Sequence, residues 1–98
     1  MIDIGGVRLS GRMICRNDDE AAAIRAHLDG HIAATRAEPG CLLFEVTPIG
    51  GGRIWSVEEI FVDADSFRAH QARTAASEWG RATVGIERAY RIEGMPRD

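Results

Sequence analysis

The chain has 98 residues, enough for one domain with a modest hydrophobic core. Hydrophobic residues make up 45% and charged residues 28%, the balance of a globular protein rather than of a disordered chain. The net charge is −3 and the twelve cationic side chains, all arginine, are scattered, so the basic stripe of a nucleic-acid-binding protein is absent. We expect a single domain over residues 1–98 with its core at about 7–92.

No apolar run approaches the length of a membrane span. The first nine residues, MIDIGGVRL, lack the basic start and apolar stretch of a secretory signal. We therefore expect a cytoplasmic protein with neither a membrane nor a nucleic acid as partner.

Residues 7–16, VRLSGRMICR, alternate apolar and polar side chains, which predicts a strand with one apolar face. Asn17 or Asp18 then caps a helix that runs to about residue 37, where Pro39 and Gly40 end it. The apolar positions at helical spacing, which we expect to be buried, are Ile24, Leu28 and Ile32.

Residues 41–46, CLLFEV, and 54–62, IWSVEEIFV, are almost continuously apolar and predict two strands joined as a hairpin through the glycines at 50–52. Asp63 caps a second helix, and a short helical turn that carries Trp79 follows it. The last strand is predicted over residues 84–92.

This order, β-α-β-β-α-β, is that of a ferredoxin-like α+β fold, with a four-stranded antiparallel sheet in the order 4-1-3-2 and helices on one face. Cys15 and Cys41 then fall on strands two positions apart, too distant for a disulfide, and we expect both to be buried thiols. Because the hairpin strands are apolar on both sides, the helix-free face should also be covered. We expect a homodimer that packs its two sheets face to face.

Two stretches, TRAEPGCLLFEV at 35–46 and WSVEEIFVDADSFRAHQ at 55–71, are followed by Trp79. Together they resemble the antibiotic biosynthesis monooxygenase (ABM) family of small dimeric α+β barrel proteins, which includes quinol monooxygenases. The resemblance implies an oxidoreductase that needs no metal, flavin or other cofactor. Such a monooxygenase removes a proton from a phenolic, hydroquinone or polycyclic aromatic substrate, and the resulting anion reduces the co-substrate dioxygen.

The sequence agrees with this in lacking CxxC, HExxH and a glycine-rich phosphate loop after a strand. The family also contains haem-degrading enzymes, so a haem-binding or haem-degrading protein, with a pocket histidine on the iron, is an alternative. A non-catalytic dimeric accessory or stress module is another.

His70 is the first catalytic candidate, because it lies one helical turn beyond Phe67 on the core side and an imidazole can take a phenolic proton near neutral pH. Its other interpretation is a half-buried packing residue bonded to a backbone carbonyl or to Glu59. Glu58 and Glu59 point to opposite faces of their strand, so one of them must face an interior and needs an arginine or His70 as partner. Glu59 could orient the ring of His70 and stabilise its charged form.

Five aromatic side chains could wall a flat slot for an aromatic substrate, or simply form core. They are Phe44, Trp55, Phe61, Phe67 and Trp79.

Asn17 is a further binding candidate, because a polar residue near this position contributes to some active sites of the superfamily; its capping role explains it equally well. His27 and His31 are spaced i, i+4, a spacing that can grip a metal. We expect both on a solvated helix face and predict no metal site.

Overall fold

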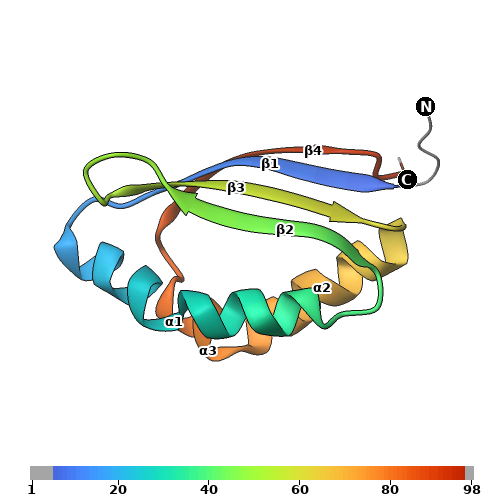
Figure 1. Ribbon diagram of the computed structural model, residues 1–98, viewed down its shortest axis with the longest axis horizontal. Helices are drawn as coiled ribbons and strands as arrows, with labels where there is room; N and C mark the ends of the chain where they lie inside the picture. Colours follow the sequence, from blue (N-terminus) through green and yellow to red (C-terminus); the bar gives the residue numbers. More distant parts are fainter. Residues whose placement is uncertain (1–5, 97–98) are drawn as a thin grey trace.

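The structure is a computed structural model that describes residues 6–96. Its elements in chain order are β1 (Val7–Ile14), α1 (Asp18–Arg36), β2 (Cys41–Pro48), β3 (Ile54–Phe61), α2 (Ala64–Ala76), α3 (Glu78–Ala82) and β4 (Glu87–Glu93). The strands form one antiparallel sheet in the order β2-β3-β1-β4. All three helices lie on the same side of this sheet (Figure 1). The predicted ferredoxin-like fold and strand order are confirmed.

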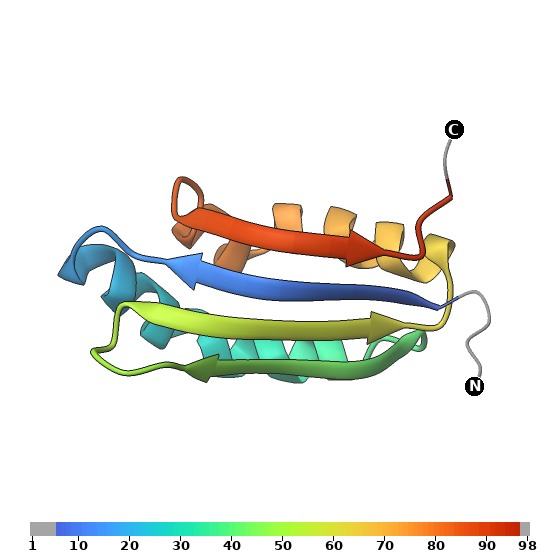
Figure 2. The same ribbon diagram turned by 90° about the horizontal axis from the view of Figure 1, so that it is seen from above.

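Capping side chains mark the N-termini of both long helices. Asn17 is the N-cap of α1, and its side-chain oxygen accepts from the backbone N–H of Glu20 at 2.9 Å. Asp63 caps α2 in the same way, accepting from the N–H of Ser66 at 2.8 Å. Viewed from above the sheet, α1 runs below the β2–β3 side and α2 below the β4 side (Figure 2).

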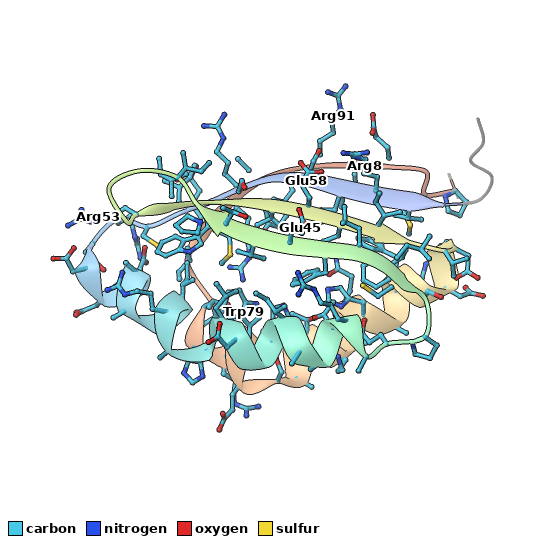
Figure 3. All side chains as sticks on the ribbon, in the orientation of Figure 1. Arg8, Glu45, Arg53, Glu58, Trp79 and Arg91 are labelled. Carbon is cyan, nitrogen blue, oxygen red and sulfur yellow. The ribbon has the colours of Figure 1, made fainter. Side chains whose placement is uncertain are left out.

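The sheet has a buried face and a helix-free outer face. Along β3 the side chains that point toward the helices are Trp55, Val57, Glu59 and Phe61, all buried, while those between them are half-buried on the outer face. Glu58 lies on that outer face, where it accepts from Arg8 of β1 at 2.9 Å, and Figure 3 shows both residues above the sheet.

A bulge in β2 decides which of its side chains face the helices. The register with β3 shifts between Cys41 and Leu43, so that Phe44 pairs with Glu59 rather than lying on the opposite face from it. Leu42 is left 64% exposed, and Phe44 is buried between the sheet and α1. Simple alternation from Cys41 would have placed Leu43 and Glu45 inside instead.

Gly40 fixes how closely α2 approaches the end of α1. A Cβ added at this buried position would lie 2.2 Å from the side-chain oxygen of Ser66 in the first turn of α2. A glycine is therefore required before β2 if the N-terminus of α2 is to pack against the α1–β2 turn.

The structure corrects several predicted details. Of the three apolar positions of α1 that were expected to be buried, Ile24 is buried, while Leu28 and Ile32 are half-buried. The last strand begins at Glu87 rather than at residue 84, because the chain turns there: Val84 is 78% exposed, Gly85 has a φ of +90° and the N–H of Ile86 bonds to the carbonyl of Thr83. Cys41 is half-buried rather than buried, since it starts the edge strand β2; Cys15 is buried, and both thiols are free. Within residues 6–96, no helix combines the length and the apolar character needed to cross a membrane.

Candidate active site

A small, partly enclosed cavity of about 60 Å³ lies between the sheet and the helices. Every strand and every helix contributes to its wall. Its polar and aromatic lining residues are His31, Phe44, Glu59, His70, Gln71, Thr74, Trp79, Arg88 and Tyr90. In Figure 3, the labelled Trp79 lies between the helices and the sheet.

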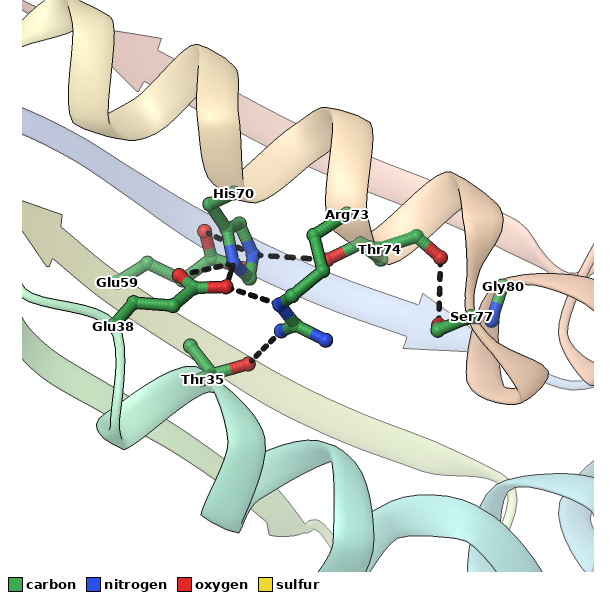
Figure 4. A network of polar contacts seen from close by, with 8 residues as sticks. All are labelled: Thr35, Glu38, Glu59, His70, Arg73, Thr74, Ser77 and Gly80. Atoms are coloured by element: carbon green, nitrogen blue, oxygen red, sulfur yellow. Dashed lines mark hydrogen bonds and ion pairs between the residues drawn. The ribbon is translucent and has the colours of Figure 1, made fainter.

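His70 projects from α2 to the wall of this cavity and is 2% exposed. Its Nδ1 lies 3.0 Å from Oε1 and 3.3 Å from Oε2 of Glu38, in the turn after α1. Its Nε2 lies on the other side of the ring, 3.4 Å from the hydroxyl oxygen of Thr74 and 3.8 Å from Oε1 of Glu59 (Figure 4). The contact with Glu59 is within ion-pair range but too long for a hydrogen bond.

Glu38 has a second side-chain partner, Arg73, on the surface side of His70. Arg73 donates to it through Nε, and Nη2 of Arg73 also donates to the hydroxyl of Thr35 at 3.0 Å. Glu38, His70 and Arg73 all line a second, open cleft of about 470 Å³ between the α1–β2 turn and α2. His70 therefore separates this outer cleft from the partly enclosed cavity.

The electrostatics of the site favour a neutral His70. Burial lowers the pKa of His70 below its usual 6.5, and the carboxylate of Glu38 offsets that shift only in part. The imidazole is consequently uncharged at neutral pH and able to accept a proton. Burial, together with the negative charge of Glu38, raises the pKa of Glu59 to about 7, so this carboxyl group exchanges protons in the same pH range.

His31 is the second buried imidazole of the cavity. Its ring stacks on Trp79 with centroids 4.6 Å apart and planes inclined by 4°, and burial lowers its pKa to about 3. His31 is therefore neutral at physiological pH. The prediction of a solvated face for His27 and His31 is wrong for His31, which is 6% exposed because α3 covers it.

Two buried side-chain atoms of the cavity wall have no hydrogen-bond partner among the described residues: Nδ1 of His31 and Oε1 of Glu59. Buried polar atoms without partners are costly, and in proteins they commonly mark sites where water or a ligand completes the bonding. On the β4 wall, burial raises the pKa of Tyr90 to about 12, so its hydroxyl keeps its proton.

Residues 14–82 match the model of a protein family described as antibiotic biosynthesis monooxygenase. The chain belongs to the antibiotic biosynthesis monooxygenase family. The match includes His31, Glu38, Glu59 and His70, whereas Arg88 and Tyr90 of the cavity wall lie beyond it.

Solved structures share the fold of this ABM domain. MupZ from Pseudomonas fluorescens aligns with a TM-score of 0.76 at 18% identity, covering 94% of this chain and 70% of its own. SnoaB, a cofactor-independent oxygenase from Streptomyces nogalater, aligns with a TM-score of 0.75 at 12% identity over 97% of each chain. Rv0793 from Mycobacterium tuberculosis gives 0.70 at 22% identity, covering 95% and 96% of the two chains. No curated protein matches the sequence.

The predicted site residues lie in three different parts of the ABM domain: the cavity, the hydrophobic core and the surface. His70, Glu59, Phe44 and Trp79 line the partly enclosed cavity. Three other aromatic side chains are buried in the hydrophobic core instead: Trp55, Phe61 and Phe67. Asn17 is exposed at the N-terminus of α1, where it acts as the helix cap.

Sequence reasoning missed Glu38 and the inward position of His31. A signal for His31 was present: it lies seven residues, about two helical turns, after the buried Ile24, and the buried Thr35 follows one turn later. Glu38 sits in a turn, where no periodicity predicts the direction of a side chain. Among residues 6–96, no group of three or more histidine, cysteine, aspartate or glutamate side chains is placed to hold a metal ion.

Proposed function

We propose that this ABM domain is a cofactor-independent monooxygenase that oxidises a small phenolic or hydroquinone substrate with dioxygen. The observation that carries the proposal is the neutral imidazole of His70, whose Nε2 faces the cavity beside the unpartnered Oε1 of Glu59. The family membership and the shared fold of the oxygenase SnoaB are consistent with it.

In the proposed reaction, Nε2 of His70 accepts the proton of a substrate hydroxyl. A ring carbon of the resulting phenolate adds dioxygen, which gives a carbon-bound peroxide, and the imidazolium of His70 returns the proton to the outer peroxide oxygen. Loss of the ring hydrogen with that hydroxyl as water leaves a quinone carbonyl. One oxygen atom thus ends in the product and the other in water, and the four electrons that reduce dioxygen come from the substrate.

Neutral His31 is placed to bond a second oxygen of the substrate, since its Nδ1 lacks a partner in the same cavity. The phenyl ring of Phe44 and the indole of Trp79 supply apolar walls for an aromatic ring.

The volume of about 60 Å³ is well below the roughly 300 Å³ at which ligand pockets usually begin, so a ring can enter only if the wall moves. Trp79 sits on the five-residue helix α3, the shortest element of the wall, and its movement away from His31 would enlarge the space. The small volume favours single-ring substrates over polycyclic ones.

A haem-binding role fits this geometry less well. Nδ1 of His70 is engaged by Glu38, and Nε2 opens into a space far smaller than a porphyrin needs. Haem titration, read as a Soret band, measures this alternative directly.

An oxygen electrode provides the test of the proposed function. We expect the protein to accelerate oxygen uptake over buffer with single-ring hydroquinones or phenols, more than with anthrones, with quinone appearing in step. Equal uptake in buffer and in protein solution across a panel of single-ring and polycyclic substrates would refute the monooxygenase proposal.

We also propose that the protein is a homodimer through the outer sheet face. That face carries no helix, and it combines half-buried apolar side chains such as Ile54 and Ile60 with arginine and glutamate side chains of both signs (Figures 1 and 3). In a two-fold interface, arginine side chains of one copy can pair with glutamate side chains of the other.

Ile60→Glu tests this arrangement, because the new carboxylate is tolerated beside Arg8 in the single chain but is desolvated in a sheet-to-sheet interface. Sedimentation should show a dimer for the wild type and a dissociation constant raised roughly tenfold or more for the variant. Val84→Glu, on a turn side chain that is 78% exposed, should remain dimeric. A monomeric wild type at high concentration contradicts the proposal.

A further inference from the structure

The carboxylate of Glu38 contacts the nitrogen of His70 that faces away from the cavity. The two residues are 32 positions apart in the sequence, and their bond bridges the α1–β2 turn and α2. Glu38 accepts at this bond, because the same carboxylate also accepts from Arg73. The proton of a neutral His70 therefore sits on Nδ1, and Nε2 is an acceptor. The hydroxyl of Thr74 can donate to Nε2 at 3.4 Å, and Oε1 of Glu59 and the cavity lie on the same side of the ring.

We propose that Glu38 is the positioning residue of the site: it fixes the Nδ1–H tautomer of His70, aims Nε2 at the substrate and stabilises the imidazolium formed when the substrate proton is taken. This inference rests on the proposed function for its kinetic part only. The proton itself stays on Nε2 until it returns to the peroxide, so Glu38 remains a carboxylate throughout and the proton balance of the reaction is unchanged.

The geometry favours Glu38 over Glu59 for this role. Oε1 of Glu38 lies 3.0 Å from His70, whereas Oε1 of Glu59 lies at 3.8 Å, has no hydrogen bond and lines the cavity where the substrate hydroxyl would sit. Glu38 is in turn held by Arg73, which Thr35 steadies through its hydroxyl (Figure 4). A carboxylate held at both oxygens keeps the ring in one orientation.

Several charged or titratable groups face His70 or its cavity from the surrounding elements. They are Glu38 in the α1–β2 turn, Glu59 on β3, His31 on α1, Arg73 on α2 itself, and Arg88 and Tyr90 on β4. Of these, Glu38 is the one whose negative charge raises the pKa of His70 against the effect of burial. Removing that charge leaves burial and Arg73, both of which lower it.

The first test needs no turnover. Nitrogen-15 NMR of the full chain should show neutral His70 protonated at Nδ1 and unprotonated at Nε2. In Glu38→Gln the pKa of His70 should fall, and in Glu38→Ala the Nδ1–H preference should also weaken. Glu20→Gln is the matched control, because Glu20 is likewise paired with an arginine, Arg16 at 2.7 Å, but at the far end of α1. An Nε2–H tautomer in the wild type, or an unchanged tautomer and pKa in Glu38→Ala, overturns the proposal.

The second test uses the outer cleft, which gives small molecules access to position 38. With a substrate that the wild type turns over, Glu38→Ala should lower kcat roughly 10- to 100-fold with little change in KM, and added formate should restore activity in a concentration-dependent way. A loss that formate does not restore, with a raised KM, would show that Glu38 acts only in folding or binding. If the wild type oxidises no substrate, the proposed function fails, while the NMR result still decides the role of Glu38.

Discussion

His70→Ala is expected to lower kcat/KM for phenol or hydroquinone oxidation by about 10²- to 10⁴-fold, the range of a general base that acts in the rate-limiting proton transfer. The reason is geometric as well as chemical: Nε2 is the nitrogen that faces the cavity, and Nδ1 is tied to Glu38. The wild-type activity should fall as the pH drops through the pKa of His70, since the base must be neutral. Because burial lowers that pKa, the fall should lie below pH 6.5.

His70→Asn serves as a second variant, since its amide can still donate to Glu38 and keeps more of the buried contact than alanine does. His27→Ala is the matched control, because His27 is the one histidine of the chain that does not line the partly enclosed cavity. Folding of each variant is checked by circular dichroism before rates are compared. If His70→Ala and His70→Asn keep wild-type rates while folded, His70 is a packing residue and the proposed base is wrong.

His31→Phe is expected to gain stability relative to the wild type as the pH falls. The pKa of His31 is about 3 in the folded protein and near 6.5 in the unfolded chain, so the wild type binds more protons when unfolded. Its contribution to stability is full above pH 6.5 and is lost as the pH falls toward 3. Between pH 7.5 and pH 5 the difference in unfolding free energy between variant and wild type should grow by about 2 kcal/mol.

The measured quantity is the difference in unfolding free energy between variant and wild type, because the titration of Glu59 changes the stability of both proteins with pH in the opposite direction. With a pKa raised to about 7, Glu59 favours the folded state at low pH and loses that contribution as the pH rises. Phenylalanine keeps a ring against Trp79 and removes the unpartnered nitrogen. Urea unfolding of both proteins at the two pH values gives the difference, with His27→Phe as control; parallel pH dependences of His31→Phe and wild type would contradict the assignment of a buried neutral His31.

The sequence predicted the direction of some site residues that lie within regular strands and helices. Alternation in β3 predicted that Glu58 and Glu59 point to opposite faces, and Glu59 does face the interior while Glu58 pairs with Arg8 outside. Helical spacing predicted that His70 follows Phe67 on the core side, and both are buried. Periodicity fixes side-chain direction within an element, so the sequence was sufficient for the direction of His70 and for the opposite directions of the two glutamates.

Periodicity could not predict which side chains of β2 face the helices. A bulge between Cys41 and Leu43 turns Phe44 toward the cavity, and a bulge changes every later position of a strand without changing its composition. The stacking of His31 on Trp79 likewise depends on where the short helix α3 packs against α1.

By itself, the sequence determined the order of strands and helices and the inward direction of His70, because these follow from local periodicity and capping. Its motifs carried the family resemblance, and alternation showed that one of Glu58 and Glu59 faces inward. Only the tertiary structure decided that Glu38, from a turn 32 positions away, is the partner of His70. That contact requires the α1–β2 turn to pack against α2, and Gly40 allows it by leaving room for Ser66. Such an approach depends on the packing of whole elements, which no pattern within one segment encodes.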